Sequence, residues 1–256
     1  MSDARNEPWE PVRKVRTYEQ VMAQIEQRIS DGYLRPGDRL PSEREFSQLL
    51  EVSRPSLREA LRVLQALGIV DVKAGAGRDG GSVFVGSPGS GFADLLRLQL
   101  ALGHFSDTDV LQTRLALEVW VAAEAARQAT EDDIAKLTDV LDRMDDPELS
   151  ARTFNHLDAE FHVTIAESAG NSLSAHFMGS LRTAIERRMV DAYEQLDDWR
   201  RTARTVRQEH RDILAAIERR DAEAAVALVR EHITTFYADT YGLGSAAGPR
   251  TDTLQP

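Results

Sequence analysis

The sequence predicts a mainly α-helical protein of two domains: a small N-terminal domain with a winged helix-turn-helix, and a C-terminal all-α antiparallel helical bundle. Three observations favour this fold class. Apolar residues recur at helical spacing through most of the chain, β-like runs occur only before residue 86, and a Gly/Pro/Ser-rich stretch separates the two regions. A chain of 256 residues is long enough for two domains.

The N-terminal domain is expected at residues 13–86, after a polar arm at 1–12 that we expect to be disordered. Its first amphipathic helix should end near Ser30. Ser42 is expected to cap a second, short helix, because Glu45 follows three residues later, as a capping box requires.

A third helix should follow at once, with Ser53 as its N-cap and Pro55 inside its first turn. Gly68 is typical of the position just after a helix C-terminus. Two helices joined by so short a turn form a helix-turn-helix. The third helix carries Arg54 and Arg58 on one face, four residues apart and roughly opposite its apolar side. Such a helix fits the major groove of DNA, although arginines on a helix face are often only solvated.

Two β-like runs, 69–72 and 82–85, flank the segment AGAGRDGG at 74–81. This pattern predicts a hairpin with a glycine-rich tip, the wing of a winged helix. Glycine lets the backbone come close to a phosphate or a minor groove.

The ordered set of PSERE, SRPSLREAL and the glycine-rich hairpin closely resembles the winged-helix domain of the GntR superfamily of bacterial transcription regulators. The resemblance implies contacts with double-stranded operator DNA. Pro55 stands where many relatives carry a hydroxyl residue, so a side-chain contact from that position is not expected. The residues that the resemblance assigns to DNA binding are Arg44, Ser53, Arg54, Ser56 and Arg58, with Gly75 and Gly77 in the wing.

Composition limits the classes of function. The chain has no cysteine, which excludes disulfides and thiolate sites and fits a reducing cytoplasm. It has no apolar run of the length that a membrane span needs, so we expect a cytoplasmic protein without membrane contact. The net charge is −11, yet residues 1–88 hold 13 basic and 13 acidic residues, so the acidic excess lies entirely after them. A neutral domain with focused arginines can still bind phosphates.

Residues 87–91 are a linker by composition, residues 92–241 should form the helical bundle, and 242–256 should be a disordered tail. Asp107 is expected to cap a long helix, and Thr130 is expected to cap the next one. Another helix should begin at Pro147 and run to about Ala169. Three long helical stretches follow, and no strand is expected after residue 85.

Four polar residues occupy positions that helical periodicity assigns to the bundle core: Asp158, His162, His210 and His232. The first two are four apart and share a helix face; the other two lie on two further helices. A buried carboxylate is costly unless it is paired or binds a metal. The set suits a divalent transition metal such as Zn²⁺, Ni²⁺, Mn²⁺ or Fe²⁺. The alternatives are a hydrogen-bonded network of core histidines and a purely structural metal.

This half of the chain resembles the FCD ligand-binding domain, which marks the FadR-like branch of the GntR regulators. The Asp-x-x-x-His pair with two later histidines matches the metal signature of many such domains. The resemblance implies a small organic acid as effector, whose carboxylate completes the coordination of the metal. Arg114 could bind that carboxylate or could pair with Glu118 instead. Asn171 is a weaker candidate for the effector site and could simply cap a helix.

Together these features predict a metal-containing, effector-responsive transcription regulator that acts as a homodimer, with repression relieved by the effector as the family's usual outcome. Two winged helices would then reach successive half-sites of a near-palindromic operator. The rival hypothesis is a metal-dependent hydrolase or lyase with an accessory DNA-binding domain. No separate general base stands out beside the four ligands, so we do not expect an enzyme.

Overall fold

The computed structural model describes residues 17–73, 81–85 and 89–243. The chain divides into two compact units, residues 1–91 and 92–256. The predicted arm at 1–12, the glycines Gly75 and Gly77, residues 87 and 88 of the linker, and all but the first two residues of the tail lie outside the described residues.

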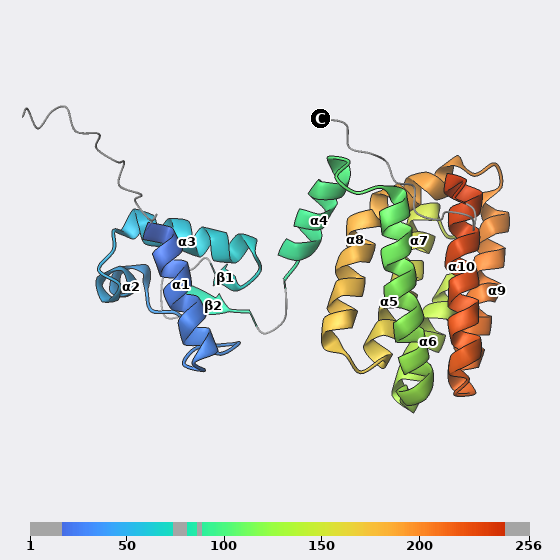
Figure 1. Cartoon of the computed structure of the whole chain (residues 1–256), viewed down its shortest axis with the longest axis horizontal. Helices are drawn as coiled ribbons and strands as arrows, with labels where there is room; N and C mark the ends of the chain where they lie inside the picture. Colours follow the sequence, from blue (N-terminus) through green and yellow to red (C-terminus); the bar gives the residue numbers. More distant parts are fainter. Residues whose placement is uncertain (1–16, 74–80, 86–88, 244–256) are drawn as a thin grey trace, which may run out of the picture. The chain divides into compact units, whose positions relative to one another are not determined.

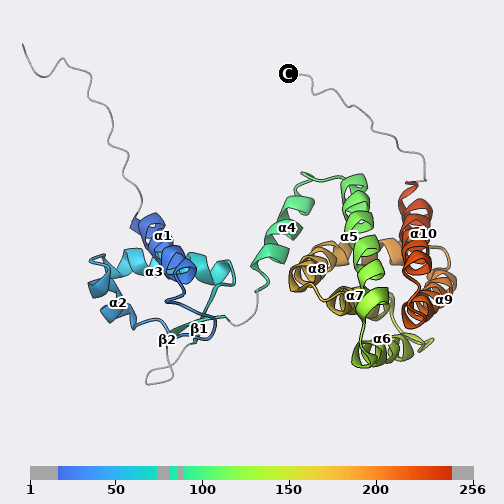
Figure 2. The same ribbon diagram turned by 60° about the horizontal axis from the view of Figure 1, so that its bottom comes forward.

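The first unit contains three helices and a two-stranded antiparallel sheet within its described residues (Figures 1 and 2). These elements are α1 Thr17–Ser30, α2 Glu43–Leu49, α3 Arg54–Ala66, β1 Val70–Lys73 and β2 Gly81–Phe84. α1 packs on α3, and their apolar sides meet Phe46 of α2 and the two strands. The side chains at the centre of this core are Val21, Ile25, Leu57, Leu61, Leu64, Val70 and Phe84.

The helix-turn-helix follows the predicted local chemistry. Ser42 and Glu45 form the capping box of α2, and the Ser53 side chain accepts a hydrogen bond from the Ser56 backbone to cap α3. Gly68 has a φ of +70° just after α3, a conformation that glycine adopts without steric cost. β2 also pairs with the turn before α2, where Leu40 donates its N–H to the Ser82 carbonyl at 2.9 Å. The hairpin is thereby tied to the helix-turn-helix.

The second unit is an all-α bundle. Its helices are α4 Gly91–Ala101, α5 Asp107–Gln128, α6 Glu131–Met144, α7 Ala151–Ser168, α8 Ser172–Gln195, α9 Trp199–Glu218 and α10 Ala222–Tyr241. α5 packs against α10 and α7, α7 packs against α6 and α8, and α9 packs against α10 and α6 (Figure 2). α7 therefore lies inside the bundle, and eleven of its 18 residues are buried. The predicted fold class, mainly α with a winged helix-turn-helix and a helical bundle, is confirmed.

Two predicted helix starts were wrong. The side chain that caps α5 is Ser106, which forms a capping box with Asp109, so Asp107 is already the first helical residue. α7 begins at Ala151 after its cap Ser150, and not at Pro147. The Asp146 carboxylate accepts the Glu148 backbone N–H at 2.9 Å, and this local turn competes with a helical start at the proline.

None of the helices in the described part of the chain combines the length and the apolar composition needed to cross a lipid bilayer.

Candidate metal centre and DNA-binding face

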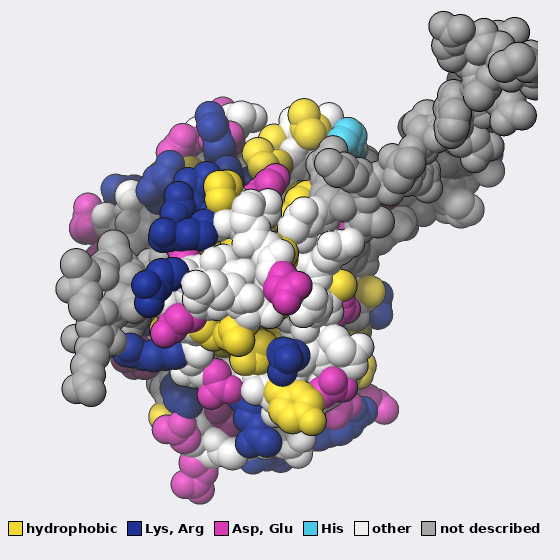
Figure 3. Space-filling view, turned by 90° about the vertical axis from the view of Figure 1, so that its left-hand side faces the viewer, with side chains coloured by type: hydrophobic (Ala, Val, Ile, Leu, Met, Phe, Trp, Pro, Cys, Tyr) yellow, Lys and Arg dark blue, Asp and Glu magenta, His cyan; other side chains and the backbone are white. Residues whose placement is uncertain are grey.

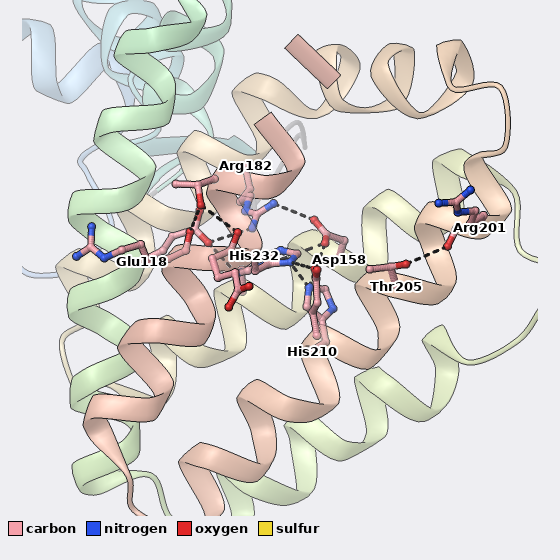
Figure 4. A network of polar contacts seen from close by, with 12 residues as sticks. Glu118, Asp158, Arg182, Arg201, Thr205, His210 and His232 are labelled. Atoms are coloured by element: carbon pink, nitrogen blue, oxygen red, sulfur yellow. Dashed lines mark hydrogen bonds and ion pairs between the residues drawn. The ribbon is translucent and has the colours of Figure 1, made fainter. Parts of the chain in front are cut away.

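The four predicted metal ligands converge inside the bundle. Asp158 and His162 come from α7, His210 from α9 and His232 from α10, and their ligand atoms all lie within 4.8 Å of one another. Figure 4 shows Asp158, His210 and His232 pointing toward one another between these helices. All four side chains are buried, with residue exposures between 0% and 4%. Helical periodicity thus predicted four residues that the fold brings to one point.

Hydrogen bonds set the orientation of two imidazoles. The Nδ1 of His162 lies 2.7 Å from the Glu118 carboxylate, and the Nδ1 of His232 lies 2.7 Å from the Glu209 carboxylate. A carboxylate can only accept, so both rings carry their proton on Nδ1 and present an Nε2 lone pair to the centre of the cluster. Nε2 of His162 has no hydrogen-bond partner among the described residues.

The spacing fits a transition metal. The Nε2 of His210 lies 3.4 Å from the Nε2 of His232 and 3.4 Å from an Asp158 oxygen, which in turn lies 4.0 Å from the Nε2 of His162. Tetrahedral ligands about 2.1 Å from a shared ion would be about 3.4 Å apart. Three imidazoles and one carboxylate suit Zn²⁺, Ni²⁺ or Fe²⁺. They suit Mg²⁺ and Ca²⁺ less well, because these ions prefer ligand sets made only of oxygen atoms. The residues present therefore fit a divalent transition metal.

The protonation states favour the same use. Burial and the nearby Arg182 guanidinium lower the pKa of His162 to about 4. Burial and the two neighbouring imidazoles hold the pKa of His210 well below its usual value. Burial acts to raise the pKa of Asp158, but Arg182 and His162 outweigh it, and the pKa lies below its ordinary value. At neutral pH His162 and His210 are therefore neutral and Asp158 is ionised, the forms that bind a metal.

A buried ionic network surrounds the centre. Arg182, on α8, donates to Asp158 at 2.9 Å and to Glu118 at 3.2 Å, and Arg114 donates to the other Glu118 oxygen at 2.6 Å. These arginine and glutamate side chains are 1–2% exposed. The two arginines and His162 lower the pKa of Glu118 well below its usual value, against the effect of burial. The network keeps both carboxylates ionised.

Arg182 and Glu209 are the two functional candidates that the sequence analysis missed. A signal for Arg182 was present, since it lies at helical spacing with the buried Met178, Ile185 and Met189 of α8. The sequence contained no comparable signal for Glu209. This residue lies on the partly exposed side of α9, directly before the predicted ligand His210.

The two predicted effector residues lie in different settings. Arg114 pairs with Glu118, as one of the two hypotheses for it stated, and belongs to the network beside the metal ligands. Asn171 is exposed and caps α8, accepting a hydrogen bond from the Ser174 backbone at 3.1 Å. His156, two residues before Asp158, is exposed and lies outside the cluster.

The first unit presents the predicted DNA-binding side chains at its surface. Arg44, Ser53, Arg54 and Arg58 are exposed, and Ser56 is partly exposed. Figure 3 shows Lys and Arg side chains gathered in one area, with acidic side chains beside them. Arg58 donates to Glu43 at 2.8 Å, and Arg54 lies 3.9 Å from the same carboxylate. Glu43 therefore links α2 to the arginines of α3.

A winged helix-turn-helix with surface arginines is typical of a DNA-binding domain, and the second unit of this chain is a helical bundle with an internal cluster of ligand atoms. Comparisons with known proteins agree. Residues 17–78 match the family model of bacterial regulatory proteins of the gntR family, and residues 109–235 match that of the FCD domain. This protein belongs to the GntR family of bacterial transcription regulators, in the branch that carries an FCD domain.

Several named relatives cover most of the chain. It is 33% identical over 231 residues to the Uxu operon transcriptional regulator of Escherichia coli K12, covering 85% of this chain and 84% of the relative. It is 30% identical over 244 residues to the transcriptional repressor NanR of Salmonella paratyphi A, covering 91% and 88%. The regulator LutR of Bacillus subtilis is 28% identical over 207 residues, covering 80% and 93%.

Among solved structures, a GntR protein of Streptococcus agalactiae superposes with a TM-score of 0.60 at 23% identity, covering 87% of this chain and 98% of that one. This likeness supports the fold. The named relatives are transcription regulators, which favours a regulator over an enzyme for this chain as well.

Proposed function

We propose that this protein is a repressor whose affinity for operator DNA is controlled by a small organic acid bound at a divalent transition metal in the bundle. One observation carries the proposal: four buried ligand atoms from three helices lie within 4.8 Å of one another, and two of the imidazoles are oriented by carboxylates. Arg44, Ser53, Arg54, Ser56 and Arg58, with Gly75 and Gly77 of the hairpin tip, would contact the DNA.

The metal would be held by Asp158, His162, His210 and His232, and it would act as a Lewis acid that binds the effector carboxylate. Arg182 adjoins this centre, because it donates a hydrogen bond to the ligand Asp158 itself. Its Nε is buried and has no hydrogen-bond partner among the described residues. We therefore assign Arg182 a role in attracting the carboxylate. Arg114 would contribute through Glu118, whereas Asn171 would have to give up its cap to bind a ligand.

Effector binding would change the packing of α7, α9 and α10, the helices that carry the ligands. By linkage, operator binding must then change effector affinity by the same factor. Metal analysis and thermal melts against a panel of small carboxylic acids test the first half of this mechanism. The expected result is near-stoichiometric metal, lost in Asp158→Ala and His210→Ala, and one acid that raises the melting temperature only when metal is present.

An operator titration of the wild-type protein with and without that acid tests the second half. If the acid causes the protein to release DNA, the result supports a repressor that the effector inactivates. If the acid makes the protein bind DNA more tightly, the effector has the opposite effect on operator affinity. A folded wild type that takes up no metal after reconstitution would leave the four residues as a buried polar network. Metal-dependent turnover of any of the acids would instead support the hydrolase or lyase hypothesis.

The regulator would act as a homodimer, since one recognition helix reads only one half-site. α4 and the residue after it support this proposal, because Leu95, Leu98 and Leu102 lie at helical spacing and are 53%, 55% and 68% exposed. Such a stripe is usually covered by a partner surface. We expect Leu98→Glu to convert a dimer into a monomer in sedimentation experiments, while Leu49→Glu, at an exposed leucine of the first unit, leaves the dimer intact. A Leu98→Glu variant that stays dimeric would place the interface elsewhere.

A further inference from the structure

Two carboxylates, Glu118 and Glu209, each orient one histidine of the centre, and the two carboxylates lie in different surroundings. Glu118 accepts from His162 and is held by Arg114 and Arg182 in the interior. Glu209 accepts from the Nδ1 of His232 at 2.7 Å, and its side chain is 28% exposed. No arginine or lysine pairs with Glu209 among the described residues. Its hold on His232 therefore depends on that one hydrogen bond.

Glu209 also lines a cavity of about 480 Å³ between α9, α10 and the end of α8. The Glu209 side chain connects this cavity to the proposed metal site through its hydrogen bond to His232. The cavity walls are rich in carboxylates and hydroxyls, namely Asp197, Asp198, Asp239, Thr202, Thr205, Thr235 and Thr240, with Arg201 as the cation. Figure 4 shows Arg201 and Thr205 on the side of Asp158 and His210 away from Glu118. Polar molecules and cations can thus approach Glu209 from solvent.

We propose that Glu209 is the positioning residue that sets metal affinity, by holding His232 with its Nε2 toward the other three ligands. This inference rests on the proposed metal site. It adds a residue that supports the site and names the ligand that can be released first. His232 is the ligand that can be released, because its orienting carboxylate is reachable from solvent. His162 is the ligand that stays, because Glu118 is locked between two arginines.

The physical consequence is specific. Without an acceptor at Nδ1, the His232 ring loses the bond that selects its tautomer and its rotation, and a neutral imidazole can then carry its proton on Nε2, where it cannot bind a metal. Loss of such an outer carboxylate typically weakens metal binding by about 10–100-fold. Metal release should also become faster, because the ring is no longer held in one orientation.

The test compares full-length wild type with Glu209→Ala and Glu209→Gln, and Glu231→Gln is the matched control. Glu231 is exposed and adjoins His232 on α10, but its side chain takes no part in the cluster. Metal-free proteins are titrated with Co²⁺, whose visible spectrum reports the coordination, and Co²⁺ release to a chelator is timed. Melts of the metal-free proteins check the fold.

We expect Glu209→Ala to bind Co²⁺ about 10–100-fold more weakly and to release it faster, while the metal-free protein still melts cooperatively as a folded protein. Glu209→Gln should be intermediate, since its amide oxygen still accepts from Nδ1, and Glu231→Gln should match wild type. Equal affinity and release in Glu209→Ala and wild type would overturn the role of Glu209 alone. Absence of Co²⁺ binding by folded wild type would overturn the metal site, and this inference with it.

Discussion

At the residue scale, the bundle interior contains more charge than an apolar core tolerates without pairing. Arg114, Glu118, Asp158 and Arg182 are all buried, and each has a partner of opposite charge. Buried ions lose several kcal/mol of hydration each, and only close pairing with further hydrogen bonds offsets that loss. Retaining two arginines and two carboxylates beside three histidines is better explained by ligand binding than by stability.

We predict that Arg182→Ala destabilises the second domain by about 3–5 kcal/mol, because Asp158 would lose its paired guanidinium and remain a buried charge, while Glu118 would keep only Arg114 and His162. Urea unfolding followed by circular dichroism measures this change. Arg187→Ala, whose side chain is 91% exposed on the same helix, should cost less than about 0.5 kcal/mol. A mild effect of Arg182→Ala would mean that water can replace the guanidinium.

We also predict an acid-sensitive stability for the metal-free protein. The pKa of His162 is about 4 in the folded protein, because of burial and Arg182, and about 6.5 in the unfolded chain. Between these values the unfolded chain binds more protons, so stability is full above pH 6.5 and falls as the pH drops toward 4. The slope for this one group is up to about 1.4 kcal/mol per pH unit.

Unfolding free energies at a series of pH values measure that slope. His162→Gln should reduce it, since an amide can still donate to Glu118 but does not titrate. His156→Gln, at an exposed position on the same helix, should leave it unchanged. An equal slope in His162→Gln and wild type would show that other groups cause the acid sensitivity.

At the element scale, the helix starts depend on short-range capping. Ser42, Ser106 and Thr130 each form a capping box with the residue three positions later. The caps predicted at Ser42 and Thr130 are confirmed, and the cap predicted at Asp107 is wrong, because Ser106 caps α5. Both residues are common caps, and the choice depends on which one takes extended backbone angles, with φ −79° and ψ 165° at Ser106.

We predict that Ser106→Ala lowers the unfolding free energy of the second domain by about 1 kcal/mol, because the Asp109 N–H loses its acceptor. Thr108→Ala, two residues further along, should change it by less than about 0.5 kcal/mol, since this side chain takes no part in the capping box. Chemical denaturation of both variants gives the comparison, and equal effects would contradict the role of the Ser106 cap.

At the scale of the whole molecule, the net charge of −11 belongs to residues 89–256, while the DNA-binding domain is neutral overall. Under the proposed function, operator binding relies on the few arginines of α2 and α3. The acidic FCD domain helps to keep other surfaces away from DNA.

We predict that operator affinity falls steeply with salt, because phosphate neutralisation releases counterions. Arg54→Ala should weaken binding and reduce the magnitude of the slope of log affinity against log salt by about 1. Arg204→Ala, at an exposed position on α9 of the second unit, should leave the slope unchanged. Fluorescence anisotropy at several salt concentrations measures both, and an unaltered slope in Arg54→Ala would exclude a phosphate contact by that residue.

Local sequence determined the helices of this protein and which of their side chains face the core. The period of apolar residues, the caps and Gly68 predicted the helices and the fold class, because these signals act within one or two turns of chain. The same period predicted that Asp158, His162, His210 and His232 face the core, since the direction of a side chain on a helix follows from its position.

Only the tertiary structure decided what these residues meet. The four ligands from three helices converge to within 4.8 Å. The pairing of His232 with Glu209 and the links from Arg182 to Asp158 and Glu118 join residues 23 to 64 positions apart. Such contacts depend on how α5, α7, α8, α9 and α10 pack and rotate against one another. Helix packing is set by the sum of many weak side-chain contacts, so no short stretch of sequence contains it.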